Sequence, residues 1–323
     1  MKIYGCRVKD EKVLMDSRSG GAFSVLSDII LAQGGVVYGC VLGSDMQAEH
    51  RRAVSAEERD KMRGSKYVQS KTLDTFEQAA EDLKNGMFVL YSGTSCQIAG
   101  LLSYMRAAKV DTEKLYTVDI ICHGVPSPMV FNDYIIWLRK KYHIKSICSY
   151  EFRNKRDYGW KEHIETVHGL KRDYDISIYS RLFYKHVILR PVCYVCPYKS
   201  YIHESDITLG DFWGFEKNEQ GKNYDDDKGM SLLFMNTEKG EKLFEKVKSE
   251  LEWFESNREE CFQNPLSAPC KKPLNREEFW LDYSKGDFDL IARKYADYSV
   301  KTYFKGKLPG KMSRKMYKFL HKR

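Results

Sequence analysis

The sequence lacks the features of a membrane-spanning, secreted or fibrous protein. No apolar run approaches the roughly 18 residues that a membrane-spanning helix needs. The opening residues, MKIYGCR, form no apolar signal core, so we predict a cytoplasmic location. Only 8 of the 323 residues are proline and 22 are glycine, which excludes collagen-like and low-complexity chains. A chain of this length can bury a sizeable core without disulfide bonds.

Acidic residues are absent from the end of the chain. Residues 299–323 contain nine Lys and Arg and no Asp or Glu, and removing these charges from the net +8 leaves −1 for residues 1–298. Nucleic-acid enzymes more often carry basic residues around a working groove, so no nucleic-acid partner is expected. Apolar residues recur among the tail lysines at near-helical spacing: Met312, Met316, Phe319 and Leu320. The pattern is typical of peripheral contact with the inner face of a membrane, or of a solvated terminus.

The nine cysteines include no string of four that would bind a ferredoxin cluster. Without an export signal the cysteines are not expected to form disulfides. The roles that remain open for them are metal ligand, catalytic thiol and core residue. One pair, Cys193-Tyr-Val-Cys196, has the two-residue gap that metal sites favour.

Helices and apolar strands alternate in the first half of the chain. Helices are predicted at residues 22–32, 74–85, 97–108 and 129–142, and strands at 36–42, 87–91 and 115–121. This order predicts neighbouring parallel strands with right-handed crossovers. Residues 44–63 are polar and are expected at the surface.

A mixed pattern follows residue 144. Strands are predicted at residues 144–153, 163–168, 205–214 and 229–237, and helices at 178–189, 237–256 and 275–296. We therefore predict an α/β fold, α+β overall, with a parallel-stranded core and a mixed or antiparallel second half that carries the Cys-x-x-Cys loop. The expected divisions are residues 1–145, 146–298 and a basic tail at 299–323.

Two further cysteines directly follow predicted strands. Cys96 and Cys122 come just after the carboxyl ends of two strands, at the edge of a sheet where ligands bind in open α/β folds. With Cys193 and Cys196 they could hold one iron–sulfur cluster or one zinc ion. The alternative is that Cys96 and Cys122 are small core residues.

Cys96 also suggests a different chemistry. A thiolate beside an imidazole is the minimum for covalent catalysis, and His123 follows Cys122 in the second loop. The helix that opens after Cys96 would help to lower the pKa of its thiol. Alternatively, His123 is an ordinary polar loop residue.

Two segments near the start could bind a phosphorylated ligand. Ser19-Gly20-Gly21 precedes a helix whose free N–H groups would face an anion. Lys66, with Ser65, Gln69 and Ser70, could add a charge and hydrogen bonds. The same residues also occur in ordinary turns.

Taken together, several segments resemble the coenzyme F(420) hydrogenase/dehydrogenase beta-subunit family. The resemblance extends over about residues 3–280. The segments that carry it are Ser19-Gly20-Gly21, 64–70 (GSKYVQS), 93–97 (GTSCQ), 122–128 (CHGVPSP), 152–155 (FRNK) with Gly159-Trp160, Arg190-Pro191 with the Cys193/Cys196 pair, and 206–214 (DITLGDFWG).

The resemblance implies an iron–sulfur flavoprotein oxidoreductase. It would pass electrons between a [4Fe-4S] cluster, FAD and an acceptor, either the deazaflavin coenzyme or another molecule. The implied cluster ligands are Cys96, Cys122, Cys193 and Cys196. The implied FAD-binding residues are Ser19, Gly20, Gly21, Ser65, Lys66, Gln69, Ser70 and Thr94. His123 and Lys66 are the candidates for protonating or steadying the reduced flavin.

The sequence departs from the family pattern in two places. Ser95 stands where relatives usually have proline. The ferredoxin-like domain with which many relatives begin is absent, which implies a separate ferredoxin-like protein as electron donor. Some relatives lie beside surface-polysaccharide genes, which implies a link to polysaccharide biosynthesis.

Two other functions remain open at this point. One is a non-redox enzyme in which Cys96 is the nucleophile, His123 is the base, and Cys193 and Cys196 hold zinc. The other is a metal-stabilised binding protein that docks on a membrane or a glycan-assembly complex.

Overall fold

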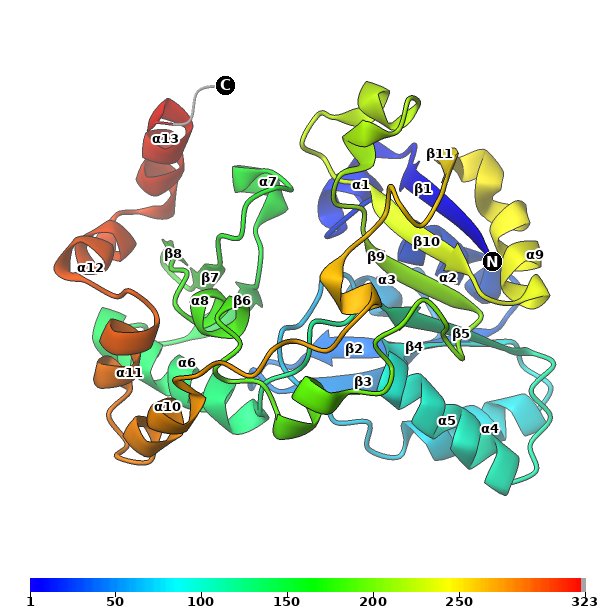
Figure 1. The fold of residues 1–323 in the computed structure, drawn as a ribbon, viewed down its shortest axis with the longest axis horizontal. Helices are drawn as coiled ribbons and strands as arrows, with labels where there is room; N and C mark the ends of the chain where they lie inside the picture. Colours follow the sequence, from blue (N-terminus) through cyan, green and yellow to red (C-terminus); the bar gives the residue numbers. More distant parts are fainter. Residues whose placement is uncertain (321–323) are drawn as a thin grey trace.

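One eight-stranded sheet forms the centre of the computed structural model, which describes residues 1–320 (Figure 1). Residues 321–323 of the predicted basic tail lie outside the described residues. The spatial order is β11-β1-β10-β9-β5-β4-β2-β3. In chain order the strands are β1 (Lys2–Val8), β2 (Val36–Leu42), β3 (Ala48–Ala53), β4 (Val89–Thr94), β5 (Leu115–Ile120), β9 (Ile207–Asp211), β10 (Ser231–Met235) and β11 (Leu251–Ser256).

The middle of this sheet is parallel, as predicted. Strands β2, β4, β5 and β9 run in one direction, so their carboxyl ends meet at one edge. The flanking strands pair antiparallel: β3 with β2, β10 with β9, β1 with β10, and β11 with β1. The predicted α/β class is confirmed.

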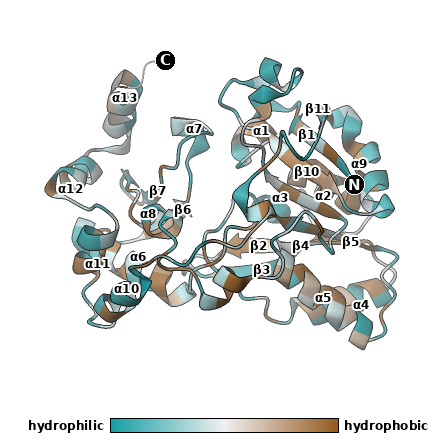
Figure 2. Cartoon of the chain, viewed as in Figure 1, coloured by the Kyte–Doolittle hydropathy of each residue, from teal (hydrophilic) through white to brown (hydrophobic). Residues whose placement is uncertain are grey.

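Helices cover both faces of the large sheet. Helices α2 (Ala22–Ala32) and α9 (Glu238–Val247) pack on the face that carries Val37 and Leu90. Helices α4 (Thr75–Lys84) and α5 (Ser95–Ala107) pack on the face of Tyr38 and Tyr91. The central strands are nearly continuous apolar runs, and consecutive strand residues point to opposite faces of the sheet. Both faces of the sheet are therefore apolar. Figure 2 shows hydrophobic central strands and a more hydrophilic α9.

A second core lies around a small antiparallel sheet of β6 (Ile147–Glu151), β7 (Thr166–Gly169) and β8 (Asp173–Asp175). The helices of this part are α6 (Pro128–Tyr142), α7 (Lys155–Tyr158), α8 (Tyr179–Tyr184), α10 (Arg276–Tyr283), α11 (Phe288–Tyr295), α12 (Val300–Lys307) and α13 (Gly310–Leu320). The remaining helices are α1 (Glu11–Asp16), α3 (Ala56–Asp60) and five 3₁₀ turns at Pro191–Val195, Phe215–Lys217, Gly221–Tyr224, Lys248–Glu250 and Asn264–Leu266.

Most predicted elements are confirmed, and the errors concern strands of the large sheet and one helix beside the small sheet. The helix predicted over residues 237–256 ends at Val247, and its last part is strand β11, which pairs with β1. Residues 44–63, expected only at the surface, contain strand β3. The helix predicted over 178–189 ends at Tyr184. Short amphipathic segments fit both periodicities, and pairing with a distant strand decides between them.

Strands from both sides of residue 145 enter the large sheet, since β9, β10 and β11 join strands of the first half. The predicted division at residue 145 stays a prediction. Within residues 1–320, no helix combines the length and the hydropathy needed to cross a bilayer.

Candidate functional site

A cavity of about 510 Å³ lies at the carboxyl edge of the parallel strands. Loops after β1, β4, β5 and β9 line it, as expected for the edge where parallel strands end. The cavity brings together most of the predicted cofactor-binding and catalytic residues: Ser19, Gly21, Ser65, Lys66, Gln69, Ser70, Thr94 and His123. Cys96 and Cys122 line the same cavity.

One end of the cavity is formed by the amino terminus of α2. Gly21 is the N-cap of this helix, with φ at +83°, and no side chain among residues 1–320 caps the first turn. Residues 21–24 line the cavity. The N–H groups of an uncapped first turn, together with the helix dipole, favour an anion.

Arg18 lies at the same end and was missed by the sequence analysis. Its Nε and Nη2 atoms are buried and have no hydrogen-bond partner within residues 1–320. Burial, aided by the nearby Arg153, lowers the pKa of Arg18 to about 10. A buried guanidinium without a partner is costly unless an anion binds beside it. This end of the cavity therefore suits a phosphate group.

Gly20 does not line the cavity, although it was predicted to bind the cofactor. A Cβ atom at Gly20 would lie 2.2 Å from the carbonyl oxygen of Cys6, so this position needs glycine for the close approach of two backbone segments. Ser19 donates a hydrogen bond from Oγ to the Met230 carbonyl at 2.7 Å. Both residues hold the loop in front of α2 against the sheet.

A chain of hydrogen bonds orders the middle of the cavity wall. His50 Nε2 lies 2.9 Å from the Ser92 carbonyl, so this nitrogen carries the proton and Nδ1 accepts from Ser70 Oγ at 3.0 Å. Gln97 Nε2 donates to Ser70 Oγ at 2.9 Å, and its Oε1 accepts from the Thr94 N–H at 3.0 Å. Burial lowers the pKa of His50 to about 4 and keeps it neutral. No sequence motif had pointed to His50, which comes from strand β3.

Lys66 projects beside this network and is held by main-chain oxygens. Its Nζ donates to the carbonyls of Lys61, Met62 and Arg63 at 3.2, 3.0 and 3.0 Å. Burial lowers the pKa of Lys66 to about 8. At neutral pH the side chain is therefore mostly protonated and can donate a proton.

The other end of the cavity carries the predicted cysteine loops. Cys96 lies in the first turn of α5 and is exposed, with Sγ 3.1 Å from Thr94 Oγ1. The capping interaction of Gln97 with Thr94 orders this turn even though Ser95 replaces proline. The Gly124 N–H donates to Cys122 Sγ at 3.3 Å, and the Val125 N–H donates to Cys193 Sγ at 3.5 Å. The loops of Cys122 and Cys193 thus lie side by side.

The four predicted ligands lie near one another, as their mutual electrostatic effects show. Cys96 and Cys193 both act to raise the pKa of Cys122, after the larger effect of burial, and the total reaches about 11. Cys196 acts on Cys193 in the same way. Even so, no group of three His, Cys, Asp or Glu side chains within residues 1–320 is close enough to hold a single metal ion.

A buried lysine faces the cysteines. Lys199 is 9% exposed, and its Nζ has no hydrogen-bond partner within the described chain. It acts to lower the pKa of Cys122, Cys193 and Cys270, against the larger effect of burial. An uncompensated buried ammonium fits a site that holds negative charge, as a cluster bound by four thiolates would supply. The facing cation suits the negative charge of four thiolates around either a cluster or a zinc ion.

His123 is not arranged as a base for Cys96. No hydrogen bond joins the two side chains among residues 1–320, where Cys96 Sγ instead contacts Thr94. Burial, followed by Lys199, lowers the pKa of His123 to about 4, so the ring is neutral at neutral pH. The nucleophile–base pair lacks the hydrogen bond that such chemistry uses.

An aromatic wall closes the cavity from the side of the second half. Trp213 lines it and stacks on Trp160, with ring centroids 4.2 Å apart. The Arg153 guanidinium lies 5.2 Å from the Trp213 ring and pairs with Asp211 at 2.6 Å. Asp211 is the last residue of β9, which confirms the strand predicted within residues 205–214, and it belongs to the Gly-Asp-Phe-Trp-Gly segment of the family resemblance.

Comparison with known proteins agrees with this architecture. The family model for the C-terminal region of the coenzyme F420 hydrogenase/dehydrogenase beta subunit matches residues 86–258, more than half of the chain. No curated protein sequence matches. Thirteen chains of solved structures match, one of them from a structure of the F420-reducing [NiFe] hydrogenase complex from Methanosarcina barkeri. That chain is 17% identical, with a TM-score of 0.54, and the match covers 93% of this chain and 94% of that one, which shows a shared fold. The chain belongs to the coenzyme F420 hydrogenase/dehydrogenase beta-subunit family, whose members are redox proteins.

Proposed function

We propose that this protein is an oxidoreductase that binds FAD in the 510 Å³ cavity and a [4Fe-4S] cluster on Cys96, Cys122, Cys193 and Cys196. The observation that carries the proposal is the cavity itself. It joins an anion-binding end, with the unpartnered Arg18 and the α2 amino terminus, to an end formed by two cysteine loops.

The anion-binding end suits the diphosphate of a dinucleotide. Arg18 offers two free N–H groups, and the first turn of α2 offers main-chain N–H groups without a side-chain cap in the described chain. Gly21 has φ at +83°, a conformation that favours glycine, and a Cβ here would crowd Val8 and Ser17, so glycine lets the chain turn into α2 at this point. We infer that these groups hold the phosphates while the ring system lies toward Cys96 and Trp213.

Flavin and cluster together supply transfer of paired and single electrons. The chain's own residues exclude water through Trp213 and the Tyr67 ring, which is stacked on Phe183 at 4.7 Å. Lys66 is the better proton donor, because its pKa of about 8 keeps it charged at neutral pH. His123, with a pKa of about 4, is neutral and can only donate a ring N–H or accept a proton.

Iron and flavin content of purified variants tests the proposal. The protein is purified without oxygen, and iron, sulfide, zinc and flavin are measured on one sample. We expect about four irons and one flavin per chain. Cys193→Ala is expected to lose iron, and Arg18→Gln is expected to lose flavin while keeping iron. Arg293→Gln, an exposed change outside the cavity lining, is the matched control.

Zinc without iron or flavin would overturn the proposal. It would instead favour the non-redox enzyme with a structural zinc or the metal-stabilised binding protein. Iron that is unchanged in Cys193→Ala would remove this cysteine from the ligand set. Circular dichroism of each variant separates loss of a cofactor from loss of the fold.

We further propose that electrons reach the cluster from a separate ferredoxin-like protein. Cys96 is exposed at the edge of the site, which supports close approach of a partner. The acceptor is proposed to be the deazaflavin coenzyme or a molecule of polysaccharide biosynthesis, as the family resemblance implies. The assay adds reduced ferredoxin and follows reduction of the flavin by its absorbance. Each acceptor is then added in turn, and reoxidation of the flavin is measured.

The basic tail is proposed to contact an anionic membrane surface from the cytoplasmic side. Phe304, Met312, Met316 and Phe319 are exposed on α12 and α13. The side chain of Leu320 lies outside what the structure describes. Pelleting with vesicles that contain anionic lipid, compared between the full chain and a chain ending at Tyr298, tests the contact. Equal pelleting would remove it.

A further inference from the structure

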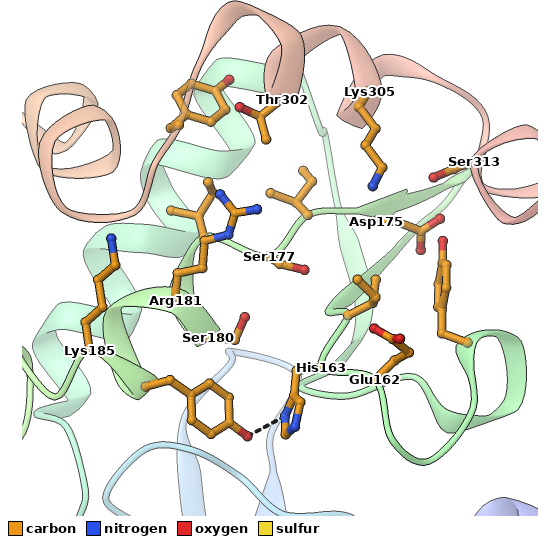
Figure 3. A pocket seen from close by; sticks show the side chains of 16 residues that line it. Glu162, His163, Asp175, Ser177, Ser180, Arg181, Lys185, Thr302, Lys305 and Ser313 are labelled. Atoms are coloured by element: carbon orange, nitrogen blue, oxygen red, sulfur yellow. Dashed lines mark hydrogen bonds between the residues drawn. The ribbon is translucent and has the colours of Figure 1, made fainter. Parts of the chain in front are cut away.

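A second cavity, of about 440 Å³, lies between the small sheet and the tail helices (Figure 3). Residues of β8 and α8 line one side, including Asp175, Ser180 and Arg181. Thr302 and Lys305 of α12 and Ser313 of α13 line the other. Its volume is within the range of about 300–1,000 Å³ that small-molecule sites have.

Three polar atoms in this second cavity are buried and have no partner in the described part of the chain. Tyr158, Asp175 and Ser313 are 6%, 8% and 2% exposed. Their Oη, Oδ2 and Oγ atoms have no hydrogen bond of ordinary geometry within residues 1–320. Ser313 and Asp175 nevertheless lie within hydrogen-bonding reach of Tyr158, since both affect its pKa in this way. Native proteins rarely leave buried polar atoms without well-formed hydrogen bonds, so a hydroxylated ligand in this cavity would complete the bonding that these three groups make only weakly among themselves.

Two cations of the second cavity have no carboxylate partner among residues 1–320. No ion pair is found for Lys305 in the described part of the chain, and Figure 3 shows its ammonium pointing into the cavity. Arg181 donates only to the main-chain carbonyls of Ala296 and Asp297, at 3.1 and 3.3 Å. Lys185, by contrast, pairs with Asp297 at 2.9 Å. Lys305 and Arg181 can therefore bind an anionic group.

The second cavity is separate from the proposed FAD cavity but shares a wall with it. His163 and Tyr184 line both, and Tyr184 Oη lies 2.6 Å from His163 Nδ1. Four residues of its lining, from Tyr298 to Ser313, lie beyond residues 86–258 matched by the family model. Two of the groups proposed below to contact the ligand, Lys305 and Ser313, are among these four residues.

We propose that the second cavity binds a phosphorylated sugar or polyol. The phosphate would lie against Lys305 and Arg181, because charge-assisted hydrogen bonds favour this pairing. The hydroxyl groups would pair with Asp175, Ser313 and Tyr158, which need both donors and acceptors. Tyrosine and isoleucine side chains in the lining give an apolar surface for the carbon skeleton. Binding at this site does not depend on FAD or on the cluster.

Calorimetric titration of the full chain tests the site with glucose 6-phosphate, ribose 5-phosphate and glycerol 3-phosphate, and with inorganic phosphate and glucose as comparisons. At least one phosphorylated ligand is expected to bind more tightly than both comparisons. Lys305→Gln is expected to weaken that binding about tenfold or more. The matched control is Lys301→Gln, on the same helix but outside the cavity lining.

Ser313→Ala separates recognition of hydroxyl groups from general attraction of anions. It removes a buried hydroxyl that has no hydrogen bond of ordinary geometry within residues 1–320, so the fold is expected to be kept. Binding of the phosphorylated sugar or polyol should weaken about fivefold, while binding of inorganic phosphate is unchanged. Failure of all three phosphorylated ligands to bind at millimolar concentration overturns the proposal, as does equal affinity of Lys305→Gln and the unmodified chain.

Discussion

The two cavities of this protein are built in different ways. The larger cavity lies at the carboxyl edge of parallel strands. Segments that come after β1, β4, β5 and β9 form much of its wall, and residues 62–70 and side chains of the second half complete it. The second cavity lies between β8, α8 and the tail helices, which meet only through packing of distant segments. Strand order alone therefore locates the first, whereas no local pattern locates the second.

The two cavities also differ in which of their buried polar atoms lack hydrogen-bond partners. At the larger cavity the unpartnered atoms belong to two cations: Nε and Nη2 of Arg18 and Nζ of Lys199. Each of these side chains lies where we expect an anion to bind. In the second cavity the unpartnered atoms are hydroxyl and carboxylate oxygens, with Lys305 beside them. The first arrangement suits phosphates and a cluster, and the second suits a hydroxylated anion.

The largest effect is expected at the wall of the larger cavity, in Arg153→Met. The variant leaves Asp211 buried without its partner at 2.6 Å. Burial acts to raise the pKa of Asp211, but Arg153, together with Arg18 and a hydrogen bond from Trp160, lowers it below its ordinary value. Losing one partner of a buried pair should lower the free energy of unfolding by about 3–5 kcal/mol, measured by urea denaturation. A change below about 1 kcal/mol, as for a surface pair, would contradict this.

Lys199 tests whether the cysteine end of the larger cavity is built for negative charge. Lys199→Gln is expected to lower the reduction potential of the bound cluster by tens of millivolts, because reduction adds negative charge that the lysine no longer offsets. Redox titration followed by electron paramagnetic resonance measures the shift. Lys199→Arg should keep most of the native potential, and an unchanged potential in Lys199→Gln would reject the role.

His168 tests the small sheet that supports the second cavity. Hydrogen bonds with Glu151 and Asp173 raise the pKa of His168 to about 9, against burial. The charged form is favoured in the fold, so its contribution is complete below pH 6.5 and is lost as the pH rises through about 9. The side chain is partly exposed, which limits the contribution to about 1 kcal/mol.

The unmodified chain should therefore lose about 1 kcal/mol of stability, relative to His168→Gln, between pH 7 and pH 10. Denaturation of both proteins across this range makes the comparison. Parallel pH profiles would show that His168 is not responsible.

The smallest effect is expected at the wall that the two cavities share. Tyr184→Phe removes the hydroxyl that lies 2.6 Å from His163 Nδ1. The same hydroxyl also donates to Tyr67 Oη at 3.3 Å, so two partly exposed hydrogen bonds are lost and the free energy of unfolding should fall by only about 1 kcal/mol. Affinities for FAD and for the phosphorylated ligand should both change, by less than in Arg18→Gln and Lys305→Gln. A change in only one affinity would show that the wall serves one cavity.

Sequence reasoning located the cysteine loops well, for a physical reason. The alternation of helices and apolar strands between residues 74 and 142 implies parallel neighbours, and parallel strands end at one edge. Cys96, Cys122 and Thr94 lie at or just past such ends, so their approach to one cavity could be predicted. The order of residues along the chain contained this information.

Other features could not be predicted from the order of residues along the chain, because they depend on contacts between distant segments. His50 enters the wall through β3, a polar strand that forms by pairing with β2. Strand β11 was taken for helix because Leu251–Ser256 fits both periodicities until β1 is placed beside it. Gly20 was assigned to the cofactor, whereas it serves a close approach of two backbone segments.

The sequence alone established the α/β class, the family resemblance and the cysteines expected to share a site, because periodicity and spacing are local properties. The tertiary structure decided which buried polar atoms of the described chain lack a hydrogen bond of ordinary geometry, and atoms of Arg18, Lys199, Tyr158, Asp175 and Ser313 are among them. Whether a buried charge or hydroxyl is satisfied depends on every segment that packs around it, and those segments are distant in the sequence. These unpaired groups, which no motif marks, carry the proposals for both cavities.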